Sequence, residues 1–211
     1  KKTLNADGVL LLESYGDNYH KAHHLGFVYV NQKGACFIPF KDALNSKAFK
    51  DYLESDYKKH TFDLKRLYVS LLSVDLTIKN VTFELLLAAY VLNPLNTKED
   101  FKVIVSNFDY QDVPYYEEVY GKGVKSEIPE PNTYIQYALK KAYAIKALQP
   151  TLDQMITDQG QKALLYDIEI PLAYTLGNME ATGIKVDIDA LNQLDAFLNQ
   201  EISDLTESIY D

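Results

Sequence analysis

The stretch Gly8-Val-Leu-Leu-Leu-Glu13 is an apolar run with the length of a single strand. Two further apolar runs follow closely, at residues 25–30 and 35–39. Between these two runs lies Asn31-Gln-Lys-Gly34, whose Asn and Gly favour a tight turn, so the pair is expected to form a hairpin. Three strands in quick succession predict a sheet that begins with antiparallel strands.

The segments after the hairpin predict helices with one short strand among them. Residues 43–53 and 64–72 have helical spacing, and residues 60–62 read as a short returning strand. The run Phe83-Glu-Leu-Leu-Leu-Ala-Ala-Tyr-Val-Leu92 is apolar nearly all round, which predicts a buried helix. Asn93-Pro94 is expected to end it.

The stretch from Leu95 to Pro131 has no strong period, which predicts a functional or mobile loop region. Helical spacing then resumes after Pro131. One side of this predicted helix carries a set of residues three and four apart, namely Tyr134, Tyr137, Ala138, Lys141, Ala142 and Ile145. The helix therefore presents particular side chains to its packing partner.

The C-terminal stretch predicts a long amphipathic helix. Asp187 has the character of an N-cap, and apolar residues recur after it at Leu191, Leu194, Leu198, Ile202, Leu205 and Ile209. We expect this helix to project from the globular body or to pack on a neighbouring molecule. Because the chain also starts without Met, we expect it to be part of a larger protein, with the rest of the same polypeptide as its partner.

The composition limits the classes of function. A net charge of −9 argues against a domain whose main task is to grip phosphate backbones. The short basic clusters, Lys58-Lys59-His60 with Lys65-Arg66 and Lys140-Lys141, are interpreted as solvated faces. The chain has no apolar run long enough for a membrane span. We therefore expect a soluble cytoplasmic protein, in keeping with a single cysteine, Cys36, read as a small buried hydrophobe.

Four stretches together resemble the family A DNA polymerases of the bacterial DNA polymerase I type. They are Gly8–Glu13, Phe83–Pro94, Val119-Tyr-Gly-Lys-Gly-Val-Lys125, and the run from Leu164 to Asp187, which includes Pro171-Leu-Ala-Tyr-Thr-Leu-Gly-Asn-Met-Glu-Ala-Thr-Gly183. The resemblance implies a ribonuclease-H-like (DnaQ-type exonuclease) fold, an α/β fold with a mixed five-stranded sheet flanked by helices and a C-terminal helical extension. It also implies two domains: a vestigial 3′-5′ exonuclease-like domain over residues 1–160 and the truncated first helices of the polymerase domain over residues 161–211.

Active members of this family hold two divalent metals with four acidic groups, and the resemblance locates the matching positions here. They are an Asp-x-Glu on the first strand, an Asp before a helix, and a Tyr-x-x-x-Asp helix. This chain has Glu13 and Tyr15 in the first motif, Leu67 at the middle acid, and Tyr137 with Lys141 in the last. Because two cations need several anionic oxygens, we expect no metal, no cofactor and no catalytic residue in this chain.

The same positions predict what these residues do in place of metal-dependent catalysis. Lys141 is expected to form an ion pair with Glu13, and the domain to act as a scaffold for template-directed synthesis by the parent polymerase, which would use Mg²⁺ and contact DNA. An active proofreading exonuclease built on Glu13, Asp63 and Asp17 remains an alternative, since another register places Asp63 at the middle acid. A third hypothesis is that the chain is an independent module that binds single-stranded DNA.

Two other sequence patterns give weaker evidence of a functional site. His20, His23 and His24 lie close in sequence but lack a second ligand pair, so a surface loop is preferred to a zinc site. Gly121-Lys-Gly-Val-Lys125 lacks the remaining residues of a nucleotide-binding loop. A solvated turn is expected there, with contact to single-stranded DNA as the alternative.

Overall fold

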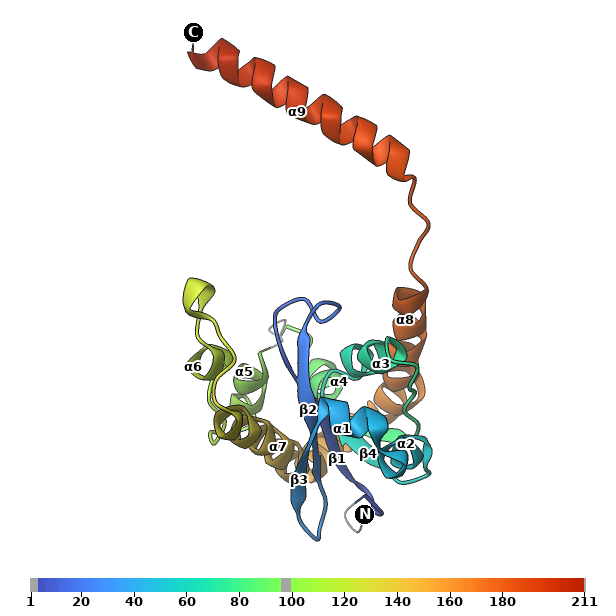
Figure 1. The fold of residues 1–211 in the computed structure, drawn as a ribbon. Coiled ribbons are helices and arrows are strands. Elements are labelled where there is room, and N and C mark those ends of the chain that lie inside the picture. Colours follow the sequence, from blue (N-terminus) through green and yellow to red (C-terminus); the bar gives the residue numbers. More distant parts are fainter. Residues whose placement is uncertain (1–3, 96–99, 211) are drawn as a thin grey trace. The chain divides into compact units, whose positions relative to one another are not determined.

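The computed structural model describes residues 4–95 and 100–210 of the chain. A five-stranded sheet in the order β3-β2-β1-β4-β5 lies at its centre (Figure 1). The first three strands are antiparallel neighbours, whereas β1, β4 and β5 run parallel. The strands are β1 (Gly8–Tyr15), β2 (His23–Val30), β3 (Ala35–Pro39), β4 (Lys59–Thr61) and β5 (Val81–Glu84). The predicted mixed sheet flanked by helices, and its antiparallel start, are therefore confirmed.

Asn31 and Gly34 form the turn between β2 and β3, as these two residue types predicted. The Asn31 N–H donates to the Gly34 carbonyl at 3.0 Å, and the Asn31 side-chain oxygen accepts from the backbone N–H of Lys33 and Gly34. Gly34 has φ +156°, a conformation that favours glycine. The hairpin therefore depends on both residues.

Two short helices replace the single helix that was predicted over residues 43–53. They are α1 (Phe40–Asn45) and α2 (Lys47–Glu54), and they are separated by Ser46. Ser46 has extended backbone, and its side chain accepts a hydrogen bond from Phe49 N at the start of α2. The prediction of one helix was wrong because Ser46 is a good N-cap, which stabilises a new helix start more than it supports continuation.

Helices cover both faces of the sheet. On one face, Phe27 and Tyr29 of β2 pack against Phe49 and Tyr52 of α2, with ring centroids 4.6 and 5.1 Å apart. On the other face lies the long helix α7 (Pro131–Asp158), which contacts β1 and β2 (Figure 1). Proline at its first position suits a helix start, where the missing N–H costs nothing.

The predicted buried helix from Phe83 begins two residues later than expected. Phe83 and Glu84 belong to β5, and α4 (Leu85–Leu92) follows directly. The Glu84 side chain accepts from the backbone N–H of Leu86 and Leu87, and so caps α4. The apolar pattern hid this boundary because a buried parallel strand and a buried helix both read as continuous apolar runs. The helix α3 (Leu64–Leu72) has the predicted bounds.

The stretch from Leu95 to Pro131 is more regular than predicted. It contains α5 (Phe101–Ser106), α6 (Tyr116–Tyr120) and the short 3₁₀ helix η1 (Gly123–Lys125), while residues 96–99 lie outside the described part. Each segment is too short to show a hydrophobic period, which is why the sequence pattern missed them. After α7 come the π-helical turn η2 (Leu164–Glu169) and α8 (Ile170–Thr182).

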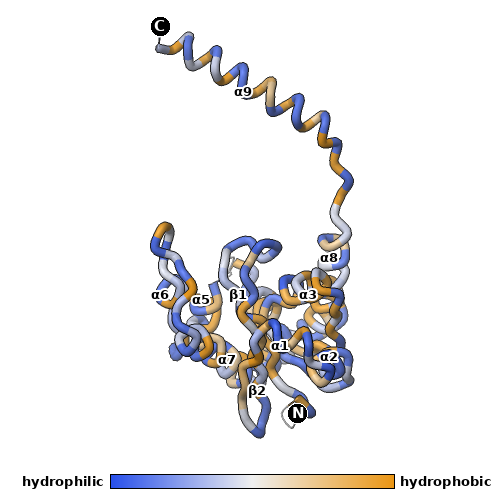
Figure 2. The backbone as a smooth tube through the Cα atoms, viewed as in Figure 1, coloured by the Kyte–Doolittle hydropathy of each residue, from blue (hydrophilic) through white to orange (hydrophobic). Residues whose placement is uncertain are grey.

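The chain divides into two compact units, with the boundary between Ala181 and Thr182. The second unit contains α9 (Ile188–Tyr210), and the Asp187 side chain accepts from Ala190 N at 3.0 Å, so the predicted N-cap is confirmed. Polar and apolar residues alternate along α9 (Figure 2), and its six predicted apolar positions are exposed. Whether residues 161–211 begin a polymerase domain remains a prediction.

Candidate functional site: the Glu13–Lys141 cavity

Glu13 lies at the centre of the candidate site and is 1% exposed. It lies on β1, directly before a register shift between Glu13 and Ser14 in the pairing with β2. Its Oε1 accepts a hydrogen bond from the Tyr120 hydroxyl at 2.7 Å, and its Oε2 lies 2.5 Å from the Lys141 ammonium. The predicted ion pair between Glu13 and Lys141 is therefore present, and both carboxylate oxygens have a partner.

Lys141 reaches Glu13 from α7, and Tyr137 lies one helical turn before it. The Lys141 ammonium is 4.5 Å from the centre of the Tyr137 ring, close enough for a cation–π contact. Lys141 is largely enclosed, with 15% of its side chain exposed. Burial and the nearby Glu13 charge raise the pKa of the Tyr137 hydroxyl, so it stays protonated beside the ion pair. The lysine thus has an anionic and an aromatic partner.

Leu67 enters the site from α3 and is 3% exposed. The helix begins at Asp63, which adopts a left-handed conformation with φ 52° and whose side chain accepts from Arg66 N at 3.1 Å. One turn later, Leu67 packs into the hydrophobic core. An apolar side chain therefore occupies the position that the family resemblance assigns to the middle acid.

A cluster of tyrosines surrounds the ion pair. The Tyr120 ring is tilted against those of Tyr116 and Tyr15 and meets Tyr137 edge-on, with ring centroids 4.6, 5.6 and 6.0 Å away. The Tyr15 hydroxyl donates to Ser126 Oγ at 3.1 Å. Burial, followed by the Glu13 charge, raises the pKa of Tyr120, which keeps it a hydrogen-bond donor to Glu13. Sequence reasoning missed Tyr116 and Tyr120, and the only signal was that Tyr120 lies inside the Val119–Lys125 stretch.

These elements enclose a cavity of about 350 Å³, here called the Glu13–Lys141 cavity. Glu13, Leu67, Tyr137 and Lys141 all line it although about 130 positions separate the first from the last, so their predicted convergence is confirmed. Tyr15 is not part of the cavity wall, but its ring packs against Tyr120, which donates to Glu13. The wall also includes Leu11, Leu12, Ser14, Gly16, Asp17, Phe62, Asp63, Arg66, Asp100, Phe101, Tyr116 and Glu117.

The donor set of this cavity does not suit two divalent cations. Both Glu13 oxygens already have partners, and the Lys141 ammonium adds a positive charge beside them. Asp17 and Asp63 share the cavity wall, yet the Asp63 side chain is engaged in capping α3. Among the residues that the structure describes, no group of three or more His, Cys, Asp and Glu is arranged to hold a metal ion.

The remaining sequence candidates lie elsewhere. His23 and His24 begin β2 rather than lying in a loop, and His24 Nδ1 is 2.8 Å from Ser14 Oγ. His20 lies in the loop before β2, where its Nε2 is 2.8 Å from Glu180. Strand pairing extends β2 to His23 because Tyr15 and His23 are register partners. The three histidines therefore lie in two elements: His23 and His24 are in β2, and His20 is in the loop before it, where it contacts Glu180.

The expectation that the basic clusters are solvated was wrong for Lys141, of whose side chain only 15% is exposed. It was also wrong for Lys59, which is fully buried. Its ammonium donates to the carbonyls of Ser55 and Tyr57 at 2.9 Å each and lies 5.0 Å from the centre of the Tyr52 ring. Burial lowers the pKa of Lys59 to about 8.

Cys36 is half-buried on β3 rather than fully buried, and burial raises the pKa of its thiol.

The fold and the cavity define a ribonuclease-H-like domain of the exonuclease type. Residues 10–148 match the family described as "DNA polymerase I, ribonuclease H-like domain". The chain belongs to this family. It is 37% identical to DNA polymerase I of Bacillus subtilis (strain 168) over 99% of this chain and 24% of the relative, and 37% identical to that of Geobacillus stearothermophilus over 96% and 23%. The chain thus spans about a quarter of these relatives' length.

Solved structures share the fold at lower identity. The POL domain of Pol1 from M. smegmatis, in complex with DNA primer-template and dNTP, has a TM-score of 0.73 and 21% identity, over 99% of this chain and 34% of that chain. Brucella melitensis NrnC has a TM-score of 0.60 and 12% identity, over 86% of this chain and 85% of that one. Within the described residues, every helix is too short or too polar to cross a membrane.

Proposed function

We propose that residues 1–160 form an exonuclease-like domain without two-metal chemistry, which serves as a scaffold in a cytoplasmic DNA polymerase I. In this proposal residues 161–211 lead into the polymerase domain, and the rest of the same polypeptide carries template-directed DNA synthesis and its Mg²⁺. DNA is a partner through that parent enzyme. The support is the family membership of the chain and the relatives' name, DNA polymerase I.

The Glu13–Lys141 ion pair carries the proposal for this domain. An ammonium 2.5 Å from the carboxylate balances its charge, so the pair offers an incoming Mg²⁺ no net attraction. A magnesium ion also needs near-octahedral oxygen ligands and sheds its water reluctantly. With Tyr15 and Leu67 at two other acid positions, hydroxide generation and leaving-group stabilisation both lack their metal.

One observation favours a second candidate, an active exonuclease with a rearranged site. Asp17, Asp63 and Glu13 line the same cavity, and with Asp100 and Glu117 its wall holds five carboxylates. This alternative requires Lys141 to leave Glu13 and Asp63 to leave the N-terminus of α3. A charge-assisted cap contributes about 1 kcal/mol, and separating a buried ion pair costs more, so we rank this candidate second.

A nuclease assay on the 211-residue chain separates the two candidates. A 5′-labelled single-stranded oligonucleotide is incubated with the chain in Mg²⁺ or in Mn²⁺, beside a sample with EDTA and a separate active 3′-5′ exonuclease as assay control. We expect no shortening of the oligonucleotide in any sample of the chain. Metal-dependent shortening that disappears in Glu13→Ala would establish the exonuclease and remove the scaffold proposal.

A restoration experiment tests whether added carboxylates at these positions create a metal site. The triple variant Tyr15→Glu, Leu67→Asp, Lys141→Asp should bind Mn²⁺ in calorimetry, whereas each single variant should not, because one or two carboxylates cannot replace the ion's water. Circular dichroism reports whether the triple variant is folded. A folded triple variant with no more Mn²⁺ binding than the parent would show that these positions cannot form a metal site.

A further inference from the structure

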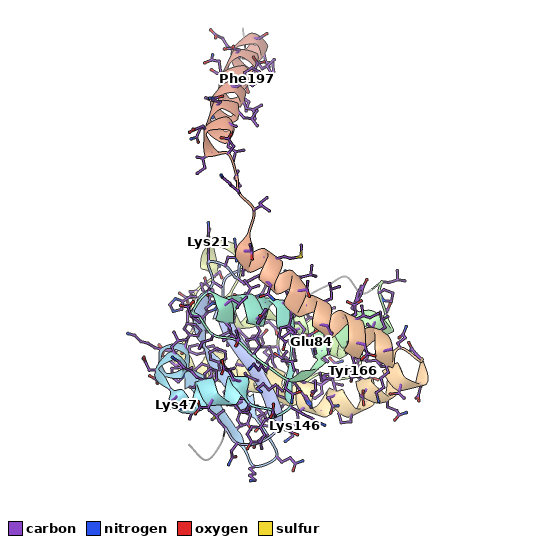
Figure 3. All side chains as sticks on the ribbon, turned by 90° about the vertical axis from the view of Figure 1, so that its right-hand side faces the viewer. Lys21, Lys47, Glu84, Lys146, Tyr166 and Phe197 are labelled. Carbon is purple, nitrogen blue, oxygen red and sulfur yellow. The ribbon has the colours of Figure 1, made fainter. Side chains whose placement is uncertain are left out.

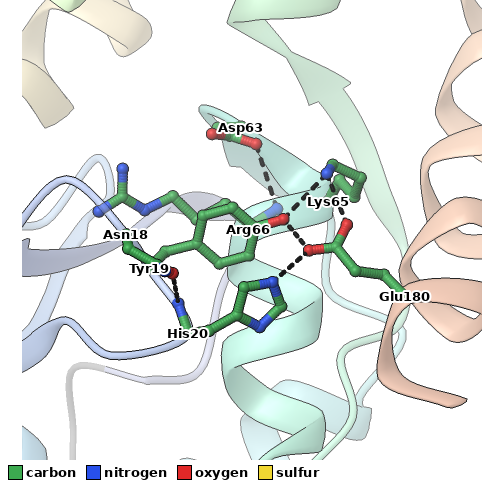
Figure 4. Close-up of polar contacts among 7 residues, drawn as sticks. All are labelled: Asn18, Tyr19, His20, Asp63, Lys65, Arg66 and Glu180. Carbon is green, nitrogen blue, oxygen red and sulfur yellow. Dashed lines mark hydrogen bonds and ion pairs between the residues drawn. The ribbon is translucent and has the colours of Figure 1, made fainter. Parts of the chain in front are cut away.

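Glu180, in the last turn of α8, receives donors from two other parts of the first unit (Figure 4). The Lys65 ammonium of α3 is 2.6 Å from its Oε2. The Tyr19 hydroxyl donates to Oε1, and His20 Nε2 lies 2.8 Å from the same oxygen. Tyr19 and His20 belong to the loop of residues 16–22 that joins β1 to β2, here called the β1–β2 loop. One carboxylate therefore joins three elements that are distant in sequence.

The contacts around Tyr19 make this junction more than a single ion pair. The Tyr19 ring stacks on His20 with centroids 4.5 Å apart, and the Lys65 and Arg66 cations lie 5.4 and 5.6 Å from its centre. Lys65 also donates to the Tyr19 hydroxyl at 2.9 Å. Burial acts to raise the pKa of Glu180, but the hydrogen bonds from Lys65 and Tyr19 outweigh it and lower that pKa. The junction therefore favours the ionised carboxylate.

The first residue of the β1–β2 loop, Gly16, is attached to Tyr116 in the wall of the Glu13–Lys141 cavity. The Gly16 N–H donates to the Tyr116 hydroxyl at 3.1 Å. Tyr116 packs on Tyr120, which in turn donates to Glu13. Gly16 has φ 115°, a conformation that few other residues adopt, so the loop leaves β1 in a defined direction. Continuous contacts thus run from Glu13 through the loop to Glu180.

Helix α8 is also seated closely on α3 just before Glu180. Gly177 faces Tyr68, and a Cβ at Gly177 would lie 2.8 Å from Tyr68 Cδ1, which is too close for a real side chain. The Tyr68 hydroxyl donates to Asn178 at 3.1 Å, and its ring meets Tyr174 edge-on at 4.9 Å. Glu180 therefore fixes the final turn of a helix whose earlier turns are already packed, shortly before the first unit ends at Ala181.

We propose that Glu180 couples the β1–β2 loop to the last turn of α8, so that a change at the Glu13–Lys141 cavity alters the order of the segment where the chain leaves the first unit. The loop is the coupling element because Tyr116 holds its first residue, Gly16, and Glu180 holds Tyr19 and His20 in its middle. A coupling of this kind is a free energy shared by the two ends, so loosening either one must loosen the other. This proposal does not depend on whether the cavity is catalytic.

Hydrogen–deuterium exchange of the 211-residue chain tests the coupling, with peptides that cover the β1–β2 loop and the end of α8. Glu180→Gln should raise exchange about three- to tenfold in both segments, because it weakens partly exposed charged hydrogen bonds. Tyr116→Phe removes only the acceptor for Gly16 N–H. It should nevertheless raise exchange at the end of α8 as well as in the loop.

Asp112→Asn is the matched control, because it removes another ion pair of the first unit, the one with Lys140 at 2.6 Å, and should change neither segment. Lys65→Met repeats the test from α3 if Glu180→Gln is poorly folded. If Tyr116→Phe loosens the loop while the end of α8 keeps its parental exchange, the coupling is absent and Glu180 is a local contact. Equal loosening of both segments by Asp112→Asn would also overturn the proposal.

Discussion

Glu13 and Glu84 are two buried carboxyl groups of the same sheet, and different partners stabilise them. Glu13 is held by side chains, those of Tyr120 and Lys141. Glu84, at the end of β5, is held by the backbone: its oxygens accept from the N–H groups of Asp63, Leu86 and Leu87 at 2.5, 3.1 and 2.5 Å. Figure 3 shows Glu84 beside α8, and it is fully buried.

The difference shows that a buried carboxylate of this sheet can be stabilised either by side chains or by backbone N–H groups. The N–H groups at the start of α4 stabilise Glu84 whatever the neighbouring side chains are, because the backbone and the helix dipole do not depend on them. The environment of Glu13 depends on the residue at position 141. The lysine there gives an ion pair. The charge of the cavity therefore depends on one side chain, whereas the backbone contacts of Glu84 do not.

The largest effect is expected when Glu13 loses its cation. Lys141→Met should destabilise the fold by about 3–5 kcal/mol at neutral pH, because a buried carboxylate is left without a counter-charge. Urea unfolding followed by circular dichroism measures the change. The double variant Glu13→Gln, Lys141→Met should recover part of the loss, since it removes the unpaired charge. A loss below about 1 kcal/mol in Lys141→Met would contradict the importance of the pair.

A pH-dependent effect is expected at Glu84. Burial raises its pKa to about 8, although the three backbone N–H groups act against this shift. A folded-state pKa above the unfolded value means that the native state binds a proton more tightly, so this contribution is complete below about pH 4.5 and is lost as the pH rises towards 8. We expect the parent to lose up to about 4 kcal/mol relative to Glu84→Gln across this window.

Urea unfolding of both proteins at several pH values measures this difference. A constant difference between Glu84→Gln and the parent from pH 4.5 to 8 would mean that the N–H donors of α4 keep Glu84 ionised throughout. That result would sharpen the comparison with Glu13, because backbone donors alone would then hold a buried charge.

A smaller effect is expected when Glu13 keeps its cation but loses its hydroxyl partner. Tyr120→Phe should cost about 1.5 kcal/mol, because it leaves Glu13 Oε1 without a donor. The ring contacts with Tyr116 and Tyr137 remain, so the loss isolates the hydrogen bond. Thermal unfolding compared with Tyr57→Phe, a change at an exposed tyrosine, provides the measurement and its control. Equal melting temperatures for the two variants would show that the Tyr120 hydroxyl contributes nothing.

The smallest effect is expected at an exposed pair. Lys47 and Asp51 are one helical turn apart on α2, with nitrogen and oxygen 2.7 Å apart and most of both side chains in solvent. Asp51→Asn should change the free energy of unfolding by less than about 0.5 kcal/mol. A loss as large as that of Lys141→Met would mean that burial is not what distinguishes the Glu13 pair.

Local patterns predicted much of the fold. The first three strands, the Asn31–Gly34 turn, helix α3 and the cap at Asp187 follow from residue types and short periods, and they are present as expected. Predictions failed where two structures share one pattern. Phe83 and Glu84 lie at a junction of buried strand and buried helix, and Ser46 both interrupts a helical period and starts a new helix.

The sequence by itself determined the residue types that are available at the candidate site, because no folding step can turn Tyr15, Leu67 or Lys141 into a carboxylate. Only the tertiary structure decided their partners. Tyr120 reaches Glu13 across 107 positions and Glu180 reaches Lys65 across 115, in both cases because packing brings distant helices against the sheet or against each other. Local periodicity carries no information about such contacts, because they depend on the path of the whole chain.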